Sequence, residues 1–391
     1  MRFALALGLG LIAFAAVGEA APEAAPRASR IHPKPEVPPR AVPSRSLTDD
    51  VRSKMNENVV TIMAGSPSGT DLSTAYEIAR VVDDGDDLRV LPIVGKGAAQ
   101  SVKDVMFLRG VDMGITQANI LKHFAQTDEL GSNFIDQIVY VAKLFTEEVH
   151  IITRSNIMDV QQLNGQLVNL GEQGSGTDIT GHLILSTLGV NAKELHLSDP
   201  EALEKLRSGE IAAIVVMAGK PAPAIEYVNG DGLKLLPIPY TKELEDSYYP
   251  ATFTHEDYPE LIPKDQTIDT VSVCTVLVAF NWGRDSLRYK KVAKFVDAFF
   301  RKFDAFQQPP QHPKWREVNF AATLEGWHRS PAAQAWINHA KETTRAMATS
   351  SFDSFLTEAA AKVSGLPASD AKRAELFREF LEWKKANAND Q

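Results

Sequence analysis

The sequence predicts an α/β fold of two lobes, and two observations carry that prediction. Apolar, β-branched runs alternate with amphipathic helical segments over 47–150, and the same alternation repeats over 151–270. Such a rhythm predicts a parallel sheet with helices on its faces. Glycine- and hydroxyl-rich turns also stand between a strand and a helix in each repeat. The single cysteine excludes a disulfide framework and a cysteine zinc site, so packing must hold both cores.

The N-terminus has the layout of an export signal. Arg2 precedes an uncharged apolar run over 3–17, and Gly18, Glu19 and Ala20 then form a small-x-small cleavage site. The apolar run is short for a membrane span, which takes about 20 residues. We therefore expect residues 1–20 to be removed on export to the periplasm. Seven prolines within 21–46 predict a disordered, extended linker after the signal.

The first lobe is expected over 47–150. Its predicted strands are β-branched and apolar, and its predicted helices carry apolar residues at helical spacing. Strands are expected over 58–63, 88–94 and 111–115, with helices over 71–82 and 101–109.

The second lobe is expected over 151–270, with crossovers between the lobes near His150 and Val271. A strand and a helix over about 271–306 return to complete the first lobe, and 307–391 form a helical C-terminal extension. Strand-like runs cover 138–145, 149–153, 167–170, 195–197, 211–217 and 271–279, and helices cover 178–188, 200–208 and 289–306. Tryptophans 315, 327 and 336 are expected to hold the extension against a lobe.

Two strand-to-helix turns carry the candidate chemistry. One runs from Gly65 through Ser66, Pro67, Ser68 and Gly69 to Thr70, and the other is Gly174, Ser175, Gly176 and Thr177. Glycines let the backbone approach a ligand closely, and free N–H groups at a helix start favour an anion. Each turn taken singly is also explained as a plain helix cap. The matched pair favours two turns that face each other across a ligand cleft.

Enzyme and nucleic-acid functions have little support in the sequence. The turns lack the phosphate-loop lysine, the dinucleotide glycine spacing and the hydrolase elbow, so we expect no catalytic residue, cofactor or metal. Glu148 and His150 would share a strand face, as half of a metal site or as a buried hydrogen-bonded pair. The net charge of −9 argues against a general nucleic-acid binder.

Further short motifs follow the first turn in order along the chain. They include Gly114 to Asn119, Leu144 to His150, Leu206 to Ala213 and Ala218 to Ile225. With the two turns, they make the chain resemble the TAXI-type solute receptors of tripartite ATP-independent periplasmic (TRAP) transporters from about residue 59 to 306. The resemblance implies a type II periplasmic-binding-protein fold with a hinge. It also implies a receptor that delivers a small organic acid or amino acid to an ion-driven membrane permease.

The resemblance places the ligand-facing loops at Gly65, Gly114, Gly174 and Ala218. The chain departs from the family at Pro67, at Asp71, which would repel a carboxylate, and at Lys220, which would attract one. A binding protein that reports a solute to a membrane sensor, without transport, remains the alternative function. The residues expected to bind the ligand are Gly65, Ser66, Ser68, Gly69, Thr70, Gln117, Asn119, Ser175, Gly176, Thr177, Gly219 and Lys220.

Overall fold

The structure is a computed structural model that describes residues 47–65, 69–85, 87–226, 228, 232–362 and 374–381. The expected export signal and linker lie outside these residues, as do Ser66, Pro67 and Ser68. Contacts divide the chain into the units Met1–Thr48 and Asp49–Gln391, and the fold described below belongs to the second unit. None of the described helices is both long and apolar enough to cross a membrane.

The described residues form a ten-stranded sheet in which the order is β2-β1-β3-β10-β4-β7-β5-β6, with β8 beside β4 and β9 beside β10. Strands β1, β2 and β3 are parallel to one another, as are β5, β6 and β7. The strands are β1 (Val59–Ala64), β2 (Arg89–Val94), β3 (Met113–Gln117), β4 (Ile138–Arg154), β5 (Leu167–Asn169), β6 (Lys193–Leu195), β7 (Ala213–Ala218), β8 (Leu233–Leu235), β9 (Tyr249–Phe253) and β10 (Ile268–Phe280).

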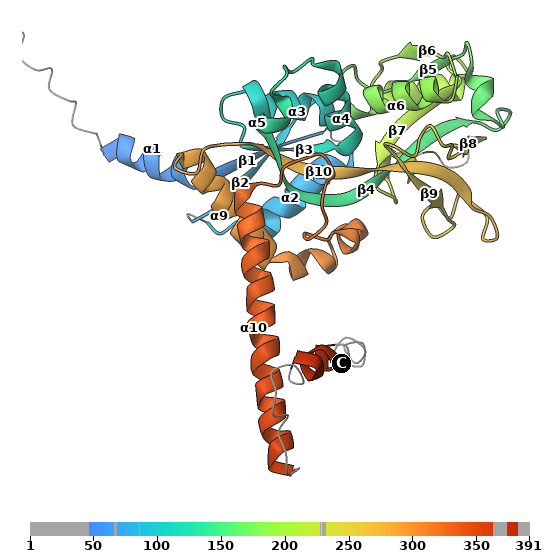
Figure 1. Cartoon of the computed structure of the whole chain (residues 1–391). Helices are drawn as coiled ribbons and strands as arrows, with labels where there is room; N and C mark the ends of the chain where they lie inside the picture. The colour runs from blue at the N-terminus through green and yellow to red at the C-terminus, as the bar shows by residue number, and fades with distance from the viewer. Residues whose placement is uncertain are drawn as a thin grey trace, which may run out of the picture. The chain divides into compact units, whose positions relative to one another are not determined.

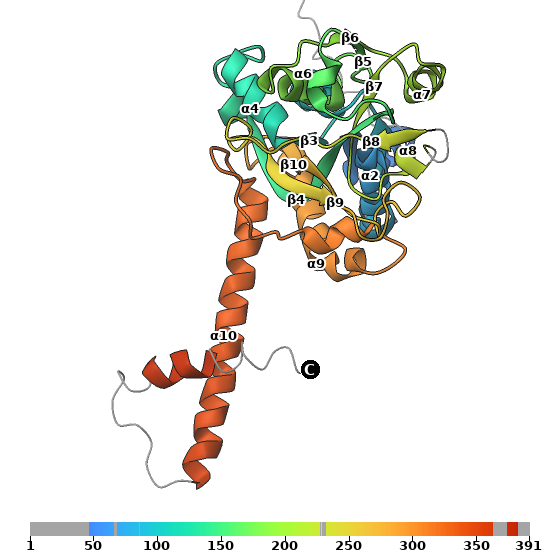
Figure 2. The same cartoon turned by 90° about the vertical axis from the view of Figure 1, so that its right-hand side faces the viewer.

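Two long antiparallel strands join the parallel groups (Figures 1 and 2). Strand β10 pairs with β4 from Phe280 opposite Ile138 to Ser272 opposite Glu148. Strand β3 pairs with the first-lobe end of β10, and β7 pairs with β4 beyond Glu148. The prediction of two α/β lobes is therefore confirmed, and β4 and β10 are the segments that the lobes share.

Helices cover both faces of the first lobe (Figure 1). Helices α2 (Thr70–Val82) and α9 (Leu287–Arg301) pack on one face, and α3 (Ala98–Phe107) and α4 (Ala118–Thr127) pack on the other. In the second lobe, α6 (Gly176–Thr187) packs against one core and α7 (Asp199–Ser208) against another. The remaining helical segments are α1 (Leu47–Glu57), α5 (Phe134–Gln137), η1 (Val160–Leu163), α8 (Pro223–Glu226), η2 (Phe303–Gln307), η3 (Pro313–Glu317) and α10 (Pro331–Lys362).

The C-terminal extension begins inside the first-lobe core. The Trp315 ring is fully buried and lies 6.0 Å from the ring of Phe299, while Trp336 lies 5.2 Å from Phe300 in an edge-on arrangement. Trp327 packs against Phe134 at 5.4 Å. All three tryptophans therefore pack the chain after α9 against the first lobe, as expected for these residues.

Some elements differ from the expectation. Strand β4 is one continuous strand of 17 residues, because Glu147 and Glu148 between its two apolar runs are buried with hydrogen-bond partners. The helix predicted over 289–306 ends at Arg301, and a 3₁₀ turn follows that directs Phe306 into the core. Helix α4, which follows β3 directly, was not predicted.

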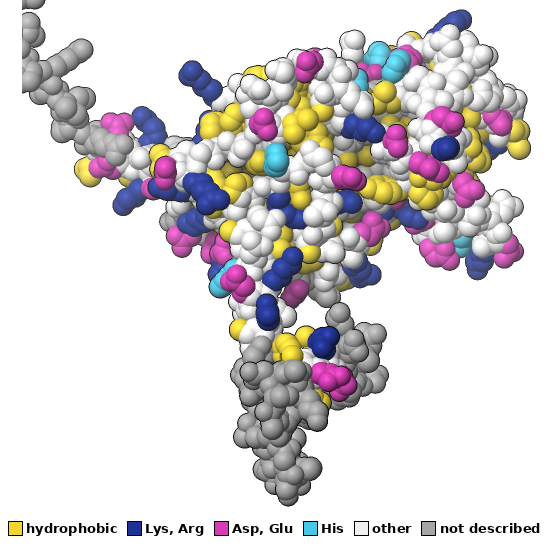
Figure 3. Space-filling model, viewed as in Figure 1, with side chains coloured by type: hydrophobic (Ala, Val, Ile, Leu, Met, Phe, Trp, Pro, Cys, Tyr) yellow, Lys and Arg dark blue, Asp and Glu magenta, His cyan; other side chains and the backbone are white. Residues whose placement is uncertain are grey.

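On the face shown in Figure 3, basic and acidic side chains are interspersed, and neither sign of charge gathers into one large patch. This mixture agrees with the mild net charge of −9. An extended nucleic-acid surface would instead gather lysine and arginine on one face.

The aromatic cluster around Phe299 generates a stability prediction. Phe299→Ala is expected to lower the free energy of unfolding by about 3–5 kcal/mol, because Phe299 is fully buried among aromatic rings. Phe107→Ala is the matched control, since the Phe107 side chain is 67 % exposed and its loss should cost about 0.5 kcal/mol or less. Urea unfolding of both variants measures the difference. Equal losses would contradict the assignment of Phe299 to the core.

Candidate functional site

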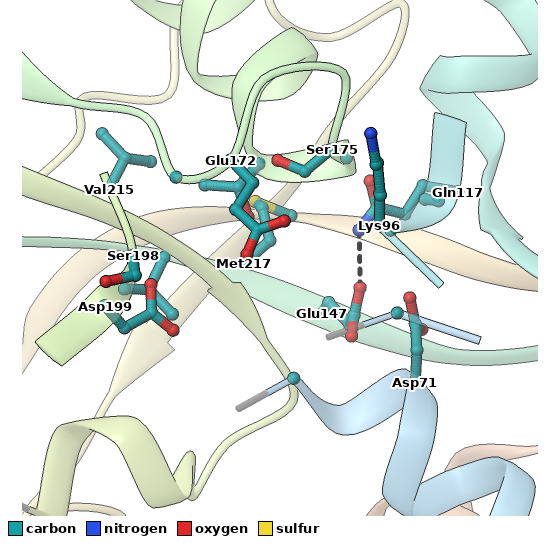
Figure 4. Close-up of a pocket in the computed structure, with 18 of the residues that line it drawn as sticks. Asp71, Lys96, Gln117, Glu147, Glu172, Ser175, Ser198, Asp199, Val215 and Met217 are labelled. Carbon is teal, nitrogen blue, oxygen red and sulfur yellow. Dashed lines mark hydrogen bonds between the residues drawn. The ribbon is translucent and has the colours of Figure 1, made fainter. Parts of the chain in front are cut away.

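A cavity of about 320 Å³ lies between the lobes, at the carboxyl ends of parallel strands (Figure 4). In open α/β sheets this is where ligands collect. The first lobe contributes Gly65, Gly69, Asp71, Lys96, Gly97, Ala98, Gln117 and Glu147. The second lobe contributes Gly171, Glu172, Ser175, Gly176, Thr177, Ser198, Asp199, Pro200, Val215, Val216 and Met217.

The two glycine-rich turns meet at this cavity. Among the expected ligand-binding residues, Gly65, Gly69, Gln117, Ser175, Gly176 and Thr177 line it. Ser66 and Ser68 lie outside the described residues. Both glycine-rich turns therefore contribute residues to this cavity, one from each lobe.

The lobes touch where the loop before α3 meets the start of α6. A side chain at Gly176 would place its Cβ 2.7 Å from Gln117 Oε1 and 2.9 Å from the Ala98 Cβ. A Cβ at Gly97 would lie 3.1 Å from Ser175, and Gly97 has a φ of +127°, which favours glycine. Glycine is required at these two positions for the close approach of the lobes.

Ser175 both caps α6 and lines the cavity. Its hydroxyl accepts a hydrogen bond from the Asp178 backbone N–H at 3.1 Å, and Asp178 in turn accepts from the Gly174 N–H at 2.8 Å. Gly176 and Thr177 occupy the first turn of the helix, where backbone N–H groups have no intrahelical acceptor. The capping explanation and the binding explanation therefore hold together at this turn, and its N–H groups are available to an anionic ligand group.

Glu147 stands in the first-lobe wall with both carboxylate oxygens hydrogen-bonded. The Thr70 hydroxyl donates to its Oε1, and the Gln117 amide donates to its Oε2 at 2.7 Å. Burial raises the pKa of Glu147, while the Thr70 and Gln117 donors act to lower it. Gly219 reaches the same network, since its N–H donates to the Thr70 hydroxyl at 3.1 Å.

Asp71 faces Glu147 from the first turn of α2, and Figure 4 shows the two carboxyl groups side by side. Asp71 is 7 % exposed and has no hydrogen-bond or ion-pair partner among the described residues. Burial raises its pKa well above the ordinary value, and the nearby charge of Glu147 raises it further. From the sequence alone, Asp71 was expected only to repel a carboxylate ligand.

Glu148 points to the opposite side of β4, as adjacent strand residues do. Its Oε1 accepts from the Lys314 ammonium at 2.6 Å, and its Oε2 accepts from the Lys220 N–H at 2.9 Å. Both side chains of the ion pair are nearly inaccessible, with exposures of 4 % for Lys314 and 2 % for Glu148. Burial raises the pKa of Glu148, and the Lys314 charge opposes that change.

His150 lies on the same strand with its own partners. Its Nε2 is 2.6 Å from the Tyr258 hydroxyl, and its ring stacks on Phe253 at 4.4 Å. Burial lowers the pKa of His150 to about 3, so the ring is neutral at physiological pH. Glu148 and His150 are each hydrogen-bonded, but to different residues, which corrects the expectation of a bonded pair. No group of three or more metal-ligating side chains occurs within the described ranges.

Four described residues of the expected binding set do not line the cavity: Thr70 and Gly219, which bond within the Glu147 network, and Asn119 and Lys220. The Asn119 amide donates to Thr180 at 2.8 Å and to the Tyr248 hydroxyl at 3.3 Å, so it joins α4 to the second lobe. The Lys220 ammonium bonds to Asp257 at 2.9 Å and to the Thr252 carbonyl at 2.6 Å. The carboxylate that Lys220 attracts is therefore one of the protein's own.

Comparison with known proteins identifies a family and similar folds. Residues 62–326 match the NMT1-like family. A solved structure described as a periplasmic transporter has 14 % identity and a TM-score of 0.45, over 73 % of this chain and 93 % of that chain. The periplasmic binding protein BugD has 13 % identity and a TM-score of 0.42, over 66 % of this chain and 85 % of that chain.

A third similar structure is the amino acid ABC transporter substrate-binding protein AbpA from Streptococcus pneumoniae, bound to L-arginine. It has 10 % identity and a TM-score of 0.39, over 68 % of this chain and 98 % of that chain.

The buried ion pair on β4 generates one prediction. Lys314→Met is expected to lower the free energy of unfolding by about 3–5 kcal/mol, because it leaves Glu148 buried without its cation. Adding Glu148→Gln in the same chain should recover most of that loss, since the uncompensated charge is then removed. Chemical unfolding of the single and double variants measures both effects. A double variant no more stable than Lys314→Met would contradict this account.

Asp71 generates a prediction about pH. At pH values between the ordinary and the raised pKa of Asp71, the unfolded chain has lost the carboxyl proton while the folded chain still holds it. The free energy of unfolding therefore falls as pH rises through this range. Asp71→Asn removes this loss. The variant should therefore unfold at a higher temperature than the wild type at pH 7, and at the same temperature near pH 3. The exposed Asp285→Asn serves as the control and should match the wild type at both pH values.

Proposed function

Because this chain belongs to the NMT1-like family, we propose that it is a solute-binding protein that closes its two lobes around a small organic acid or amino acid. The observation that carries this proposal is the cavity itself, which both lobes line through facing glycine-rich turns. Its volume of about 320 Å³ suits a small metabolite. A solute there contacts both lobes at once and so stabilises the closed arrangement.

The hinge of this motion is assigned to β4 and β10, since they are the strands that both lobes share. Closure brings Gly97 against Ser175 and Gly176. The first turn of α6 and the Lys96 ammonium supply donors for an acidic group of the solute. The expected ligand-binding residues that line the cavity are proposed to act in this way.

Export and delivery complete the proposal. The signal over 1–20 directs the chain to the periplasm, and the resemblance to TRAP receptors supports delivery of the solute to an ion-driven membrane permease. The receptor would supply recognition alone, so it requires neither a cofactor nor a catalytic residue.

A glycine substitution tests whether lobe closure and binding are linked. Gly176→Val should hold the lobes apart, because its side chain would meet Gln117 and Ala98. Amino acids, dicarboxylates and 2-oxoacids are screened by thermal shift. A solute at about 100 times its Kd should stabilise the wild type by about 2.7 kcal/mol. The variant should lose this gain, and urea unfolding without solute measures separately how much the substitution changes the stability of the fold.

Gly283→Val is the matched control, since no atom lies within 4 Å of the added Cβ. It should bind as the wild type does. A solute that stabilises Gly176→Val as strongly as the wild type would overturn the assignment of the site to the interlobe cavity.

A further inference from the structure

We infer that the first-lobe wall of the cavity receives a positively charged group, so that the captured solute carries an ammonium or guanidinium. This inference rests on the proposed function and narrows its ligand class. The sequence pointed to a carboxylate-bearing solute, and such a solute fits here only if it also carries a cation.

The charges that line the cavity support this assignment. The described lining residues include four carboxyl groups and one ammonium group. The carboxyl groups belong to Asp71, Glu147, Glu172 and Asp199, and the ammonium is that of Lys96. In Figure 4 the Lys96 side chain runs away from Asp71 and Glu147, and neither carboxylate forms an ion pair with it. An anionic group placed against this wall would find no ion-pair partner in Asp71 or Glu147.

Asp71 and Glu147 differ in a way that separates structural and binding roles. Glu147 accepts one hydrogen bond on each oxygen from Thr70 and Gln117, so the protein itself fixes its position. Asp71 is 7 % exposed and accepts none from the described residues. Buried polar groups normally have partners, so an unpartnered carboxyl that lines a cavity is a place for donors from a ligand.

The Asp71 carboxyl lies between the backbone at Gly65 and the cavity that it lines. A Cβ built on Gly65 would lie 3.2 Å from Asp71 Oδ2 and 3.7 Å from the Gly97 Cα, so the backbone at Gly65 lies close to the Asp71 carboxyl and to Gly97. A ligand ammonium between Asp71 and Glu147 would give Asp71 its missing partner and separate two like charges.

The energetic sense of this arrangement follows from burial. An isolated carboxylate removed from water is unfavourable unless it is paired or protonated. Burial raises the pKa of Asp71, and the charge of Glu147 raises it further, so both disfavour the ionised carboxylate. An incoming cation reverses that preference, because it stabilises the ionised carboxylate.

A series of four-carbon probes separates charge from shape. Putrescine, 4-aminobutyrate, 1,4-butanediol and succinate differ in charge on a common skeleton, and L-arginine, L-lysine and L-glutamate extend the series in length. Binding of each to the full chain is measured by calorimetry at pH 7. At least one probe with an ammonium or guanidinium group should bind, while succinate and butanediol should not.

Asp71→Asn tests the residue. The variant should weaken binding of the cationic probe by about tenfold to a hundredfold, since hydrogen bonds to charged groups are the strong ones. Its unfolding temperature should equal or exceed that of the wild type, which shows that a loss of affinity does not come from failure to fold. Asp285→Asn, an exposed change of the same chemistry outside the cavity, should leave the affinity unchanged.

The outcomes separate this inference from the proposed function. Binding of succinate or butanediol alone would overturn the cation site and leave a solute receptor standing. Cation binding that Asp71→Asn leaves unchanged would also overturn the site. No binding by any probe in the series would count against the inference and the proposed function together.

Discussion

The structure depends on two adjacent carboxylates at the centre of β4. Glu147 and Glu148 alternate across the strand, so one faces the cavity and the other faces the C-terminal segment. Glu147 fastens α2 and β3 to the strand through Thr70 and Gln117, while Glu148 fastens η3 through Lys314 and the start of the α8 loop through Lys220. Without these donors, a strand shared by both lobes would carry two buried charges in its middle.

The same pair lies where the cavity and the proposed hinge meet. The ladder of β4 changes partners at Glu148, from β10 alone in the first lobe to β7 in the second. The polar residues that interrupt the apolar run therefore mark the point where the lobes diverge. An apolar residue at Glu147 would suit the strand, but it would leave Thr70 and Gln117 without their acceptor.

Much of this arrangement could be predicted from local patterns. The repeated strand–helix rhythm predicted both lobes, and the paired turns contribute Gly65, Gly69 and Ser175 to the cavity from opposite lobes. The importance of Glu147 and Asp71 could not be predicted, because it depends on tertiary contacts between α2, β3 and β4. Lys220 illustrates the reverse case, since its partner Asp257 lies 37 residues further along the chain and only the fold brings them together.

His150 gives β4 a further property. Its imidazole is enclosed by Phe253 and Tyr258. Burial lowers its pKa to about 3, so the ring stays neutral at any pH well above that value. A histidine with its ordinary pKa changes its charge between about pH 5 and 8 and can therefore act as a pH sensor. Here burial keeps the imidazole neutral, so His150 itself carries no charge when the surrounding medium becomes mildly acidic.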